Sequence, residues 1–222
     1  MTKKLLYHTL DLVADKEIRS FYKQALDNAP EEFWIAHGSS SGAYHAPENN
    51  MKGGLANAHT LKAVFFAHTL AEHEYFLLPI EEKNNLRDIV VVAAGCHDIK
   101  KGGEPWKTYE KDGEIKYGYD KRHGIVAAEW LKQFDLRNPE KEMIIQSVYY
   151  HMNWLHPDEE ERKEALCPER PTYMRIVQYA DMMAARKWAS FLPGVHIKKD
   201  SIESYDEDSV KKAIEQLWTR KE

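Results

Sequence analysis

The residues of this chain best suited to chemistry are histidines and aspartates that recur at wide intervals. They follow one another at spacings of 38, 26, 28 and 30 residues, and they are His59, His97-Asp98, His123, His151 and Asp181. Imidazole nitrogens and carboxylate oxygens bind divalent transition metals, and each of these residues falls on or beside a segment with helical periodicity. A helical bundle brings them together only if all of them point inward, where unpaired His and Asp side chains cost free energy. Any single histidine could be an ordinary core or capping residue, but the ordered series predicts a shared metal site.

The surroundings of two of these positions support a buried site. His97-Asp98 ends the apolar run 89–96, and Asp181 lies in the largely apolar stretch 176–185. An isolated ionised aspartate in such a place is costly, and a divalent cation offsets that cost. Mixed imidazole and carboxylate ligation suits Mn, Fe, Co, Ni or Zn better than Ca, with Mg as a further candidate. We expect one or two such ions.

The segments that must position these residues are nearly all helical. Apolar periodicity and breaker residues predict helices at 15–28, 56–77, 84–97, 121–134, 139–152, 171–190 and 207–219. A long loop rich in Ser, Gly, Asn and Pro is expected at 37–54. Residues 106–119 alternate polar with aromatic side chains around Asp112-Gly113, which predicts a short β-hairpin. The predicted fold is all-α: one domain over residues 1–222, with a core at about 37–190, helical N- and C-terminal additions, and this small hairpin insertion.

Bulk properties narrow the function classes. The formal net charge is −5, so the strongly basic footprint of a protein that grips a nucleic-acid backbone is missing. The two cysteines, Cys96 and Cys167, are expected to be unpaired thiols in a reducing compartment. The first residues do not resemble a secretory signal, and the longest apolar run, 89–96, is too short to span a bilayer. We expect a cytoplasmic protein (in the host cytoplasm if phage-encoded) without membrane contact.

Six short motifs surround the candidate site residues. They are SSSGAYH at 39–45, KGGLANAHT at 52–60, AAGCHDIKKG at 93–102, RHGIVAAEWL at 122–131, YYHMNW at 149–154 and YADMMAAR at 179–186. The order H…HD…H…H…D resembles that of the HD-domain metal-dependent phosphohydrolases, over about residues 37–187. The chain is most similar to a bacterial and phage-borne HD group that carries a serine-rich Tyr-His loop before its first metal histidine. The resemblance implies an HD-domain helical bundle.

The chain departs from this family pattern at two points. The spacing from Gly-Gly-Leu to the first histidine is one residue longer in GGLANAH than is usual for the family. The usual HDIGK reads HDIKK, so Lys100 stands at the glycine position, where a positive φ would cost lysine more than glycine. Neither departure removes a candidate metal ligand.

The resemblance implies roles for the series. His59, His97, Asp98 and Asp181 would hold a first metal, and Asp98 would bridge to a second. His123 and His151 would bind that second metal or, with one metal only, contact the substrate phosphate. We expect Asp98, Lys101 and His123 to act in catalysis, which would be attack of metal-activated water on phosphorus.

A second group of residues is expected to bind substrate. Lys101 matches the lysine of HDIGK and could hold a phosphate, and Arg186 could do so with two hydrogen bonds. The loop offers Ser39 and Ser40 to an anion, Tyr44 to stack on a base, and His45 to bind phosphate or support a ligand histidine. The hairpin at 106–119 could be a lid that stacks a nucleobase or merely a surface hairpin.

The favoured function is hydrolysis of nucleotide phosphate esters, as a nucleotidase or small phosphodiesterase. The alternatives are a 3′–5′ exonuclease on single-stranded nucleic acid, an HD-fold di-iron oxygenase with the same ligands, and a non-catalytic binding domain. The acidic net charge favours a small-molecule nucleotide over nucleic acid as the partner. Trp188, Phe191 and Trp218 could serve a homodimer interface or pack in the core.

Overall fold

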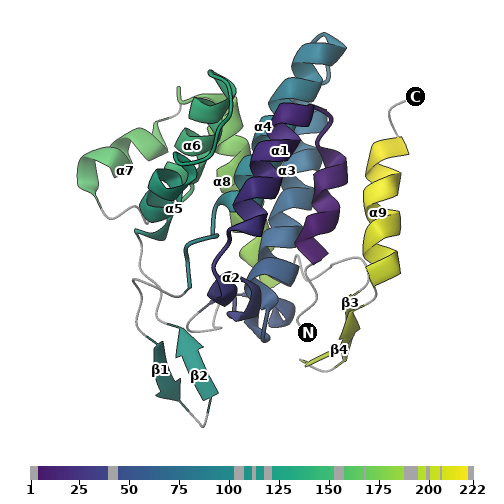
Figure 1. Cartoon of the computed structure of the whole chain (residues 1–222), viewed down its shortest axis with the longest axis vertical. Coiled ribbons are helices and arrows are strands. Elements are labelled where there is room, and N and C mark those ends of the chain that lie inside the picture. The colour runs from purple at the N-terminus through teal and green to yellow at the C-terminus, as the bar shows by residue number, and fades with distance from the viewer. Residues whose placement is uncertain are drawn as a thin grey trace.

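The computed structural model of the chain is a bundle of helices (Figure 1). It describes residues 5–39, 45–102, 108–111, 114–117, 122–152, 158–167, 169–187, 195–198, 201–205 and 207–219. The helical elements are η1 (Leu5–Leu12), α1 (Lys16–Asp27), α2 (Glu31–Ile35), η2 (Pro47–Asn50), η3 (Leu55–Thr60), α3 (Leu61–Glu74), α4 (Ile80–Cys96), α5 (His123–Leu131), α6 (Glu140–Tyr149), α7 (Glu159–Leu166), α8 (Thr172–Ala185) and α9 (Glu207–Thr219). The all-α prediction is therefore confirmed.

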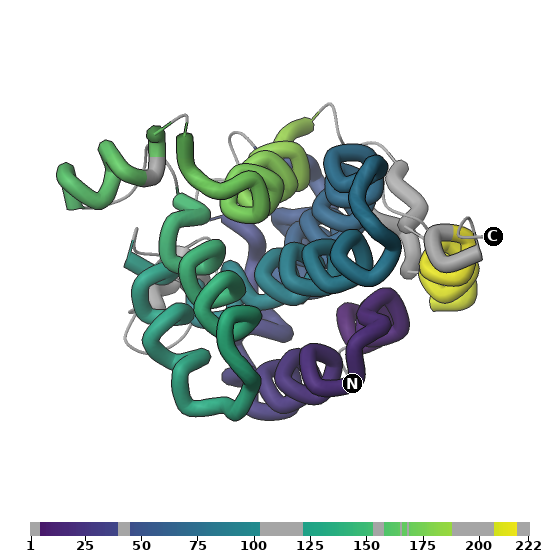
Figure 2. The backbone as a smooth tube through the Cα atoms, turned by 90° about the horizontal axis from the view of Figure 1, so that it is seen from above, coloured from purple at the N-terminus to yellow at the C-terminus, as the bar shows by residue number. Residues whose placement is uncertain are grey.

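Helix α4 is the centre of the bundle. It contacts α1, α3, α6 and α8, and Figures 1 and 2 show α1, α3 and α4 side by side. Every residue from Ile89 to Cys96 is buried, so this half of the helix is covered on all sides, as its continuous apolar sequence predicts. Among the helices that the structure describes, none has the length and apolarity to cross a membrane.

The start of helix α1 and the face that it buries both follow from its local sequence. The carboxylate of Asp15 caps its start by accepting hydrogen bonds from the backbone N–H groups of Glu17 (2.8 Å) and Ile18 (3.0 Å). The side chains that it buries are Ile18, Phe21, Tyr22, Ala25 and Leu26. The helix predicted at 15–28 is present with its apolar stripe against the core.

Strands occur only as two small hairpins within the described residues. β1 (Thr108–Lys111) pairs antiparallel with β2 (Glu114–Tyr117), inside the hairpin predicted at 106–119, whose turn at 112–113 lies outside the described residues. β3 (Val195–Lys198) pairs antiparallel with β4 (Ser201–Tyr205) just before α9. Helical additions were expected at both ends; at the C-terminal end this second hairpin precedes α9.

Two predicted helices differ from the observed ones near their functional ends. The helix predicted at 56–77 is divided into η3, which is a π-helix, and α3, which ends at Glu74. The helix predicted at 171–190 ends at Ala185, because the extended backbone of Arg186 forms a bridge with His45. The short elements η1, α2 and α7 were not predicted. Helices of one or two turns carry too little periodicity to be recognised.

Candidate metal centre

Five separate segments bring the predicted ligands together. They come from η3, the turn after α4, the start of α5, the residue pair after α6, and α8. In Figure 1 the N-terminal end of α3 and the C-terminal end of α4 lie near each other towards the lower end of the bundle. Three groups of side chains have donor atoms within 4.8 Å of one another: His59, His97 and Asp98; His97, His151 and Asp181; Asp98, His123 and His151. Each group could hold a metal ion.

The first half of this cluster surrounds one oxygen of Asp98. The Nε2 atom of His59 lies 3.2 Å from Asp98 Oδ2 and 3.0 Å from Asp181 Oδ1. The Nε2 atom of His97 lies 3.4 Å and 3.5 Å from the same two oxygens. Two imidazoles and two carboxylates therefore converge on one point.

The second half surrounds the other oxygen of the same carboxylate. His123 Nε2 lies 2.9 Å from Asp98 Oδ1, and His151 Nε2 lies 3.6 Å from it. The two Nε2 atoms are 3.1 Å apart. Asp98 thus presents Oδ2 to one pair of histidines and Oδ1 to the other, which is the arrangement of a bridging carboxylate.

Backbone carbonyls set the direction of two of the rings. Nδ1 of His97 lies 2.6 Å from the carbonyl oxygen of Ala94, and Nδ1 of His151 lies 2.7 Å from that of Val148. A carbonyl oxygen can only accept, so Nδ1 carries the proton in both rings. In the neutral rings the Nε2 lone pairs therefore point into the cluster, as metal ligation requires.

Three observations show that this donor set fits a cation. Asp98 Oδ1 is fully buried and accepts no well-directed hydrogen bond within the described part of the chain. Nε2 atoms face each other at 3.3 Å in the His59–His97 pair and at 3.1 Å in the His123–His151 pair, so four ring nitrogens converge where a cation could take the place of the protons between them. The ammonium of Lys101 already lies 2.7 Å from Asp98 Oδ2, so the carboxylate attracts a positive charge even without a metal.

The protonation of the two halves differs. Burial opposes the charged forms throughout, yet Lys101 and His97 hold the pKa of Asp98 well below its usual range. Burial also opposes protonation of His97, but Asp98 and Asp181 raise its pKa to about 10. Burial lowers the pKa of His151 to about 4. The first half therefore carries more negative charge to be neutralised than the second.

The segment GGLANAH, which the resemblance predicts to be one residue longer than usual, contains the π-helix η3. This element spans Leu55–Thr60, begins after Gly53 with φ 77°, and has all six residues buried. A π-turn closes hydrogen bonds one residue farther along than an α-turn, so it takes up one additional residue without rotating the following helix. His59 consequently reaches the cluster despite the altered spacing.

Gly124, which sequence reasoning missed, makes room for a ligand ring. A Cβ atom at this position would lie 2.8 Å from Cε1 and 2.9 Å from Nδ1 of His151. It would also lie 3.0 Å from the carbonyl oxygen of Val148, which orients the same ring. The available signal was the glycine directly after His123 in the middle of a helix-forming segment.

The residues predicted to bind substrate differ in their position relative to the cluster, in their exposure, and in whether the structure describes them. His45 lies beside His59, with ring centroids 5.4 Å apart, and burial together with His59 and Lys101 lowers the pKa of His45 to about 3. Arg186 is exposed, while its backbone pairs with that of His45. Ser39 is partly buried; Ser40 and Tyr44, with Trp188 and Phe191, lie outside the described residues, and the side chain of Trp218 is not described either. Lys100, at the glycine position of HDIGK, instead places its ammonium 5.8 Å from the ring centre of Trp130.

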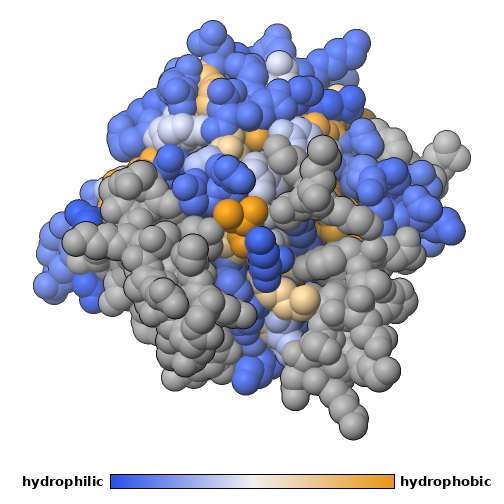
Figure 3. Space-filling model, turned by 60° about the horizontal axis from the view of Figure 1, so that its bottom comes forward, coloured by the Kyte–Doolittle hydropathy of each residue, from blue (hydrophilic) through white to orange (hydrophobic). Residues whose placement is uncertain are grey.

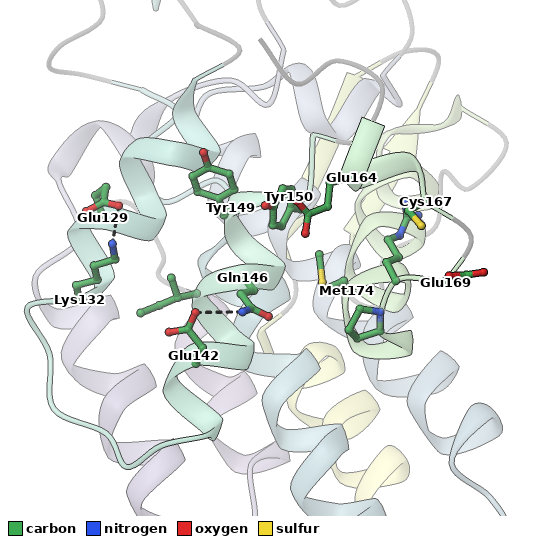
Figure 4. Close-up of a pocket in the computed structure, with 13 residues that line it drawn as sticks. Glu129, Lys132, Glu142, Gln146, Tyr149, Tyr150, Glu164, Cys167, Glu169 and Met174 are labelled. Atoms are coloured by element: carbon green, nitrogen blue, oxygen red, sulfur yellow. Dashed lines mark hydrogen bonds and ion pairs between the residues drawn. The ribbon is translucent and has the colours of Figure 1, made fainter. Parts of the chain in front are cut away.

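A separate cavity of about 510 Å³ lies beside the end of α6 (Figure 4). None of the described site residues lines it. Its charged lining consists of Glu129, Glu142, Glu164 and Glu169 with Lys132 and Arg170, so carboxylates outnumber cations. This balance disfavours a phosphate, and the cavity is not a substitute for the histidine cluster as a phosphate-ester site.

The described surface at the lower end of the bundle is mostly hydrophilic, with a small apolar patch at its centre (Figure 3).

The candidate ligands differ in their exposure to solvent. The side chain of Asp181 is 23% exposed, whereas that of Asp98 is 1% and that of His59 is 0% exposed. Solvent therefore reaches the cluster at Asp181, on the α8 side.

Comparison with protein families assigns this architecture. The family model described as HD domain matches residues 58–186, a span that contains all six candidate ligands and more than half of the chain. Searches of curated proteins and of solved structures give no match. The serine-rich loop at 39–45 lies outside the matched span, so its similarity to one HD group stays a prediction. With its six candidate ligands gathered at one place and inside the matched span, the chain belongs to the HD-domain family of metal-dependent hydrolases.

Proposed function

We propose that the chain hydrolyses phosphate esters of nucleotides, as a nucleotidase or a small phosphodiesterase. The observation that carries the proposal is the double presentation of Asp98, whose Oδ2 faces His59 and whose Oδ1 faces His123. This arrangement supports a site for two divalent transition-metal ions, held by His59, His97, Asp98 and Asp181 on one side and by Asp98, His123 and His151 on the other. When bound, such ions supply a nucleophile from water near neutral pH and neutralise charge on the phosphoryl group.

The chain's own residues would hold the ester against this site. Once a metal satisfies Asp98, the ammonium of Lys101 becomes available to a phosphate oxygen at the edge of the cluster. Among the six candidate ligands Asp181 has the most exposed side chain, at 23%, which supports entry of the ester from the side of α8. Arg186, exposed just beyond the end of α8, would bind a second phosphate oxygen or a second phosphate, which its exposure and its backbone bridge to His45 support.

The nucleotide part of the proposal rests on the resemblance to the group with the serine-rich loop and on Tyr44 as a stacking residue. The net charge of −5 and the acidic cavity beside α6 favour a small ester over a polymer. An exonuclease would need a basic track for the backbone, and the net charge provides no support for one.

The test is a substrate panel on protein loaded separately with Mn, Fe, Co, Ni, Zn or Mg. The panel contains nucleoside phosphates, cyclic and linear dinucleotides, simple phosphate monoesters and diesters, and a labelled single-stranded oligonucleotide. We expect turnover of a nucleotide ester that is lost in Asp98→Ala and kept in the matched control Asp135→Ala, which removes an exposed aspartate. Oligonucleotide cleavage alone would indicate the exonuclease, and oxygen consumption by iron-loaded protein without hydrolysis would indicate the oxygenase.

A further inference from the structure

The segment from His45 to Asn50 is tied to the end of helix α8. The backbone N–H of Ala46 donates to the carbonyl oxygen of Ala185 at 3.1 Å, and the backbones of His45 and Arg186 form a bridge. The side-chain amide of Asn49, which is fully buried, donates to the carbonyl oxygen of Ala184 at 2.9 Å. These contacts are made by residues three to five positions after Asp181.

The same segment is tied to helix α3 by a buried ion pair. Lys62 Nζ lies 2.6 Å from Glu48 Oε1, and the two side chains are 1% and 0% exposed. Burying two charges is costly, and an apolar pair of similar size would usually stabilise a core as well. An ion pair, unlike an apolar contact, specifies its two partners. This one joins Glu48, three residues after His45, to Lys62, three residues after His59.

The segment therefore spans the two helices whose side chains meet in the first half of the cluster. η3 and α3 supply His59, and α8 supplies Asp181, with 3.0 Å between His59 Nε2 and Asp181 Oδ1. His45 is held directly beside them, with its ring 5.4 Å from that of His59.

Asn49 favours in His45 the tautomer opposite to that of His97 and His151. Because the carbonyl of Ala184 can only accept, the group of Asn49 that faces it is the NH₂ group. The same Nδ2 atom lies 3.5 Å from Nδ1 of His45, so its second hydrogen points at a ring nitrogen that must accept. In a neutral ring the proton then sits on Nε2, whereas His97 and His151 carry theirs on Nδ1.

We propose that Asn49 is a positioning residue that holds His45 in the Nε2–H form, so that His45 donates a hydrogen bond to a phosphate oxygen of the substrate and binds no metal. The proposal rests on the phosphohydrolase function above. It separates His45 from His97 and His151 by the partner of Nδ1: a backbone carbonyl faces Nδ1 in those two proposed ligands, and an amide N–H faces it in His45. The ion pair of Lys62 and Glu48 keeps Asn49 and His45 in register with His59.

The first experiment is a double-mutant cycle on kcat/KM and metal content. Asn49→Ala and His45→Ala should each lower kcat/KM by about 10- to 100-fold, largely through KM, with metal content unchanged. The double variant should lose no more than His45→Ala alone, because Asn49 acts through His45. His45→Gln, which keeps an N–H donor, should recover part of the loss.

The matched control is Asn50→Ala, which changes the neighbouring amide that faces the carbonyl of Ala46 instead of His45. It should leave kcat/KM within about twofold of the parent, because the hydrogen bond that it removes is made to the backbone of Ala46 and not to the ring of His45. Additive losses in the double variant, or loss of metal from His45→Ala, would overturn the proposal.

The second experiment needs no turnover. ¹⁵N NMR of the imidazole nitrogens in zinc-loaded protein, with His45 assigned through His45→Gln, should show the Nε2–H form in the parent chain. Asn49→Ala should show a mixture of forms. A Nδ1–H ring in the parent chain overturns the proposal even if Asn49→Ala fails to fold, whereas a Nε2–H ring in a protein that hydrolyses no ester leaves the positioning intact and removes the proposed function.

Discussion

The two halves of the histidine cluster share Asp98 but differ in charge and access. The first half adds the carboxylate of Asp181 to two imidazoles, whereas in the second half, as far as the described residues go, two imidazoles surround Asp98 and only His151 also forms a group with Asp181. Asp181 is also the partly exposed member of the set, while His123 and His151 are enclosed. Divalent cations are held more strongly by more negative ligand sets, so we expect the first half to bind its ion more tightly.

The halves also differ in how the chain builds them. The first half draws His59 from a π-helix and Asp181 from a helix far along the chain. The second half draws His123 and His151 from α5 and α6, which are consecutive and pack together, and its geometry depends on the missing Cβ of Gly124. We therefore expect the charge of the ligands to dominate the metal affinity of the first half. In the second half we expect packing around the ligand rings to dominate it.

The largest effect should come from removing what the halves share. Asp98→Ala takes a carboxylate oxygen from each half, so bound metal and hydrolysis should both fall by more than about 100-fold, the upper range for changes that only support a ligand. Metal analysis and a turnover assay measure the two losses. If Asp98→Ala kept both metal and activity, the bridging assignment would be wrong.

The next largest effects should separate the halves. Asp181→Asn removes the charge that distinguishes the first half and should weaken the tighter ion. His151→Gln should abolish only the weaker one and leave one ion per chain. Titration of metal-free protein with a competing chelator gives both affinities, and equal effects of the two variants would contradict the ranking.

A smaller and selective effect is expected at Gly124. Gly124→Ala places a methyl group 2.8 Å from Cε1 of His151, so the ring must shift, at a cost in stability of about 1–3 kcal/mol. The second ion should bind about 10- to 100-fold more weakly while the first is unchanged. Ala127→Gly is the control, because it weakens the same helix without touching His151; a matching loss in that variant would point to general destabilisation.

The smallest effect concerns pH. The raised pKa of His97, about 10, means that its ring is protonated at neutral pH in the metal-free protein and must lose a proton to bind. The lowered pKa of His151, about 4, means that its ring is already neutral. First-half affinity should rise by up to about tenfold per pH unit from pH 7 towards 9, with second-half affinity nearly constant.

Calorimetry in buffers of different ionisation enthalpy measures this proton release directly. We expect about one proton to be released with the first ion at pH 7.5 and almost none with the second. Release of equal numbers of protons with both ions would remove the electrostatic difference between the halves.

Several features of the molecule could be predicted from sequence patterns. The six candidate ligands could be named from residue type and spacing, and the family match spans all of them. Helix α1 was predictable because Asp15 caps it and five apolar residues form its stripe. The β1–β2 hairpin was predictable from its alternation around Asp112-Gly113. For the helix and the hairpin the signal lies within about one to three turns of the chain, where periodicity and capping act, whereas the ligand series was identified from its order over more than 120 residues.

The contacts between side chains of separate helices could be known only from the tertiary structure. It decided that Oδ1 and Oδ2 of Asp98 face different histidine pairs, and that a π-helix absorbs the extra residue before His59. It buried Lys62 and Glu48, which the sequence alone would leave on the surface, and it placed Asn49 against His45. Spacing along one chain cannot specify these contacts, because each one is set by how separate helices pack and by which atom of a side chain then faces its neighbour.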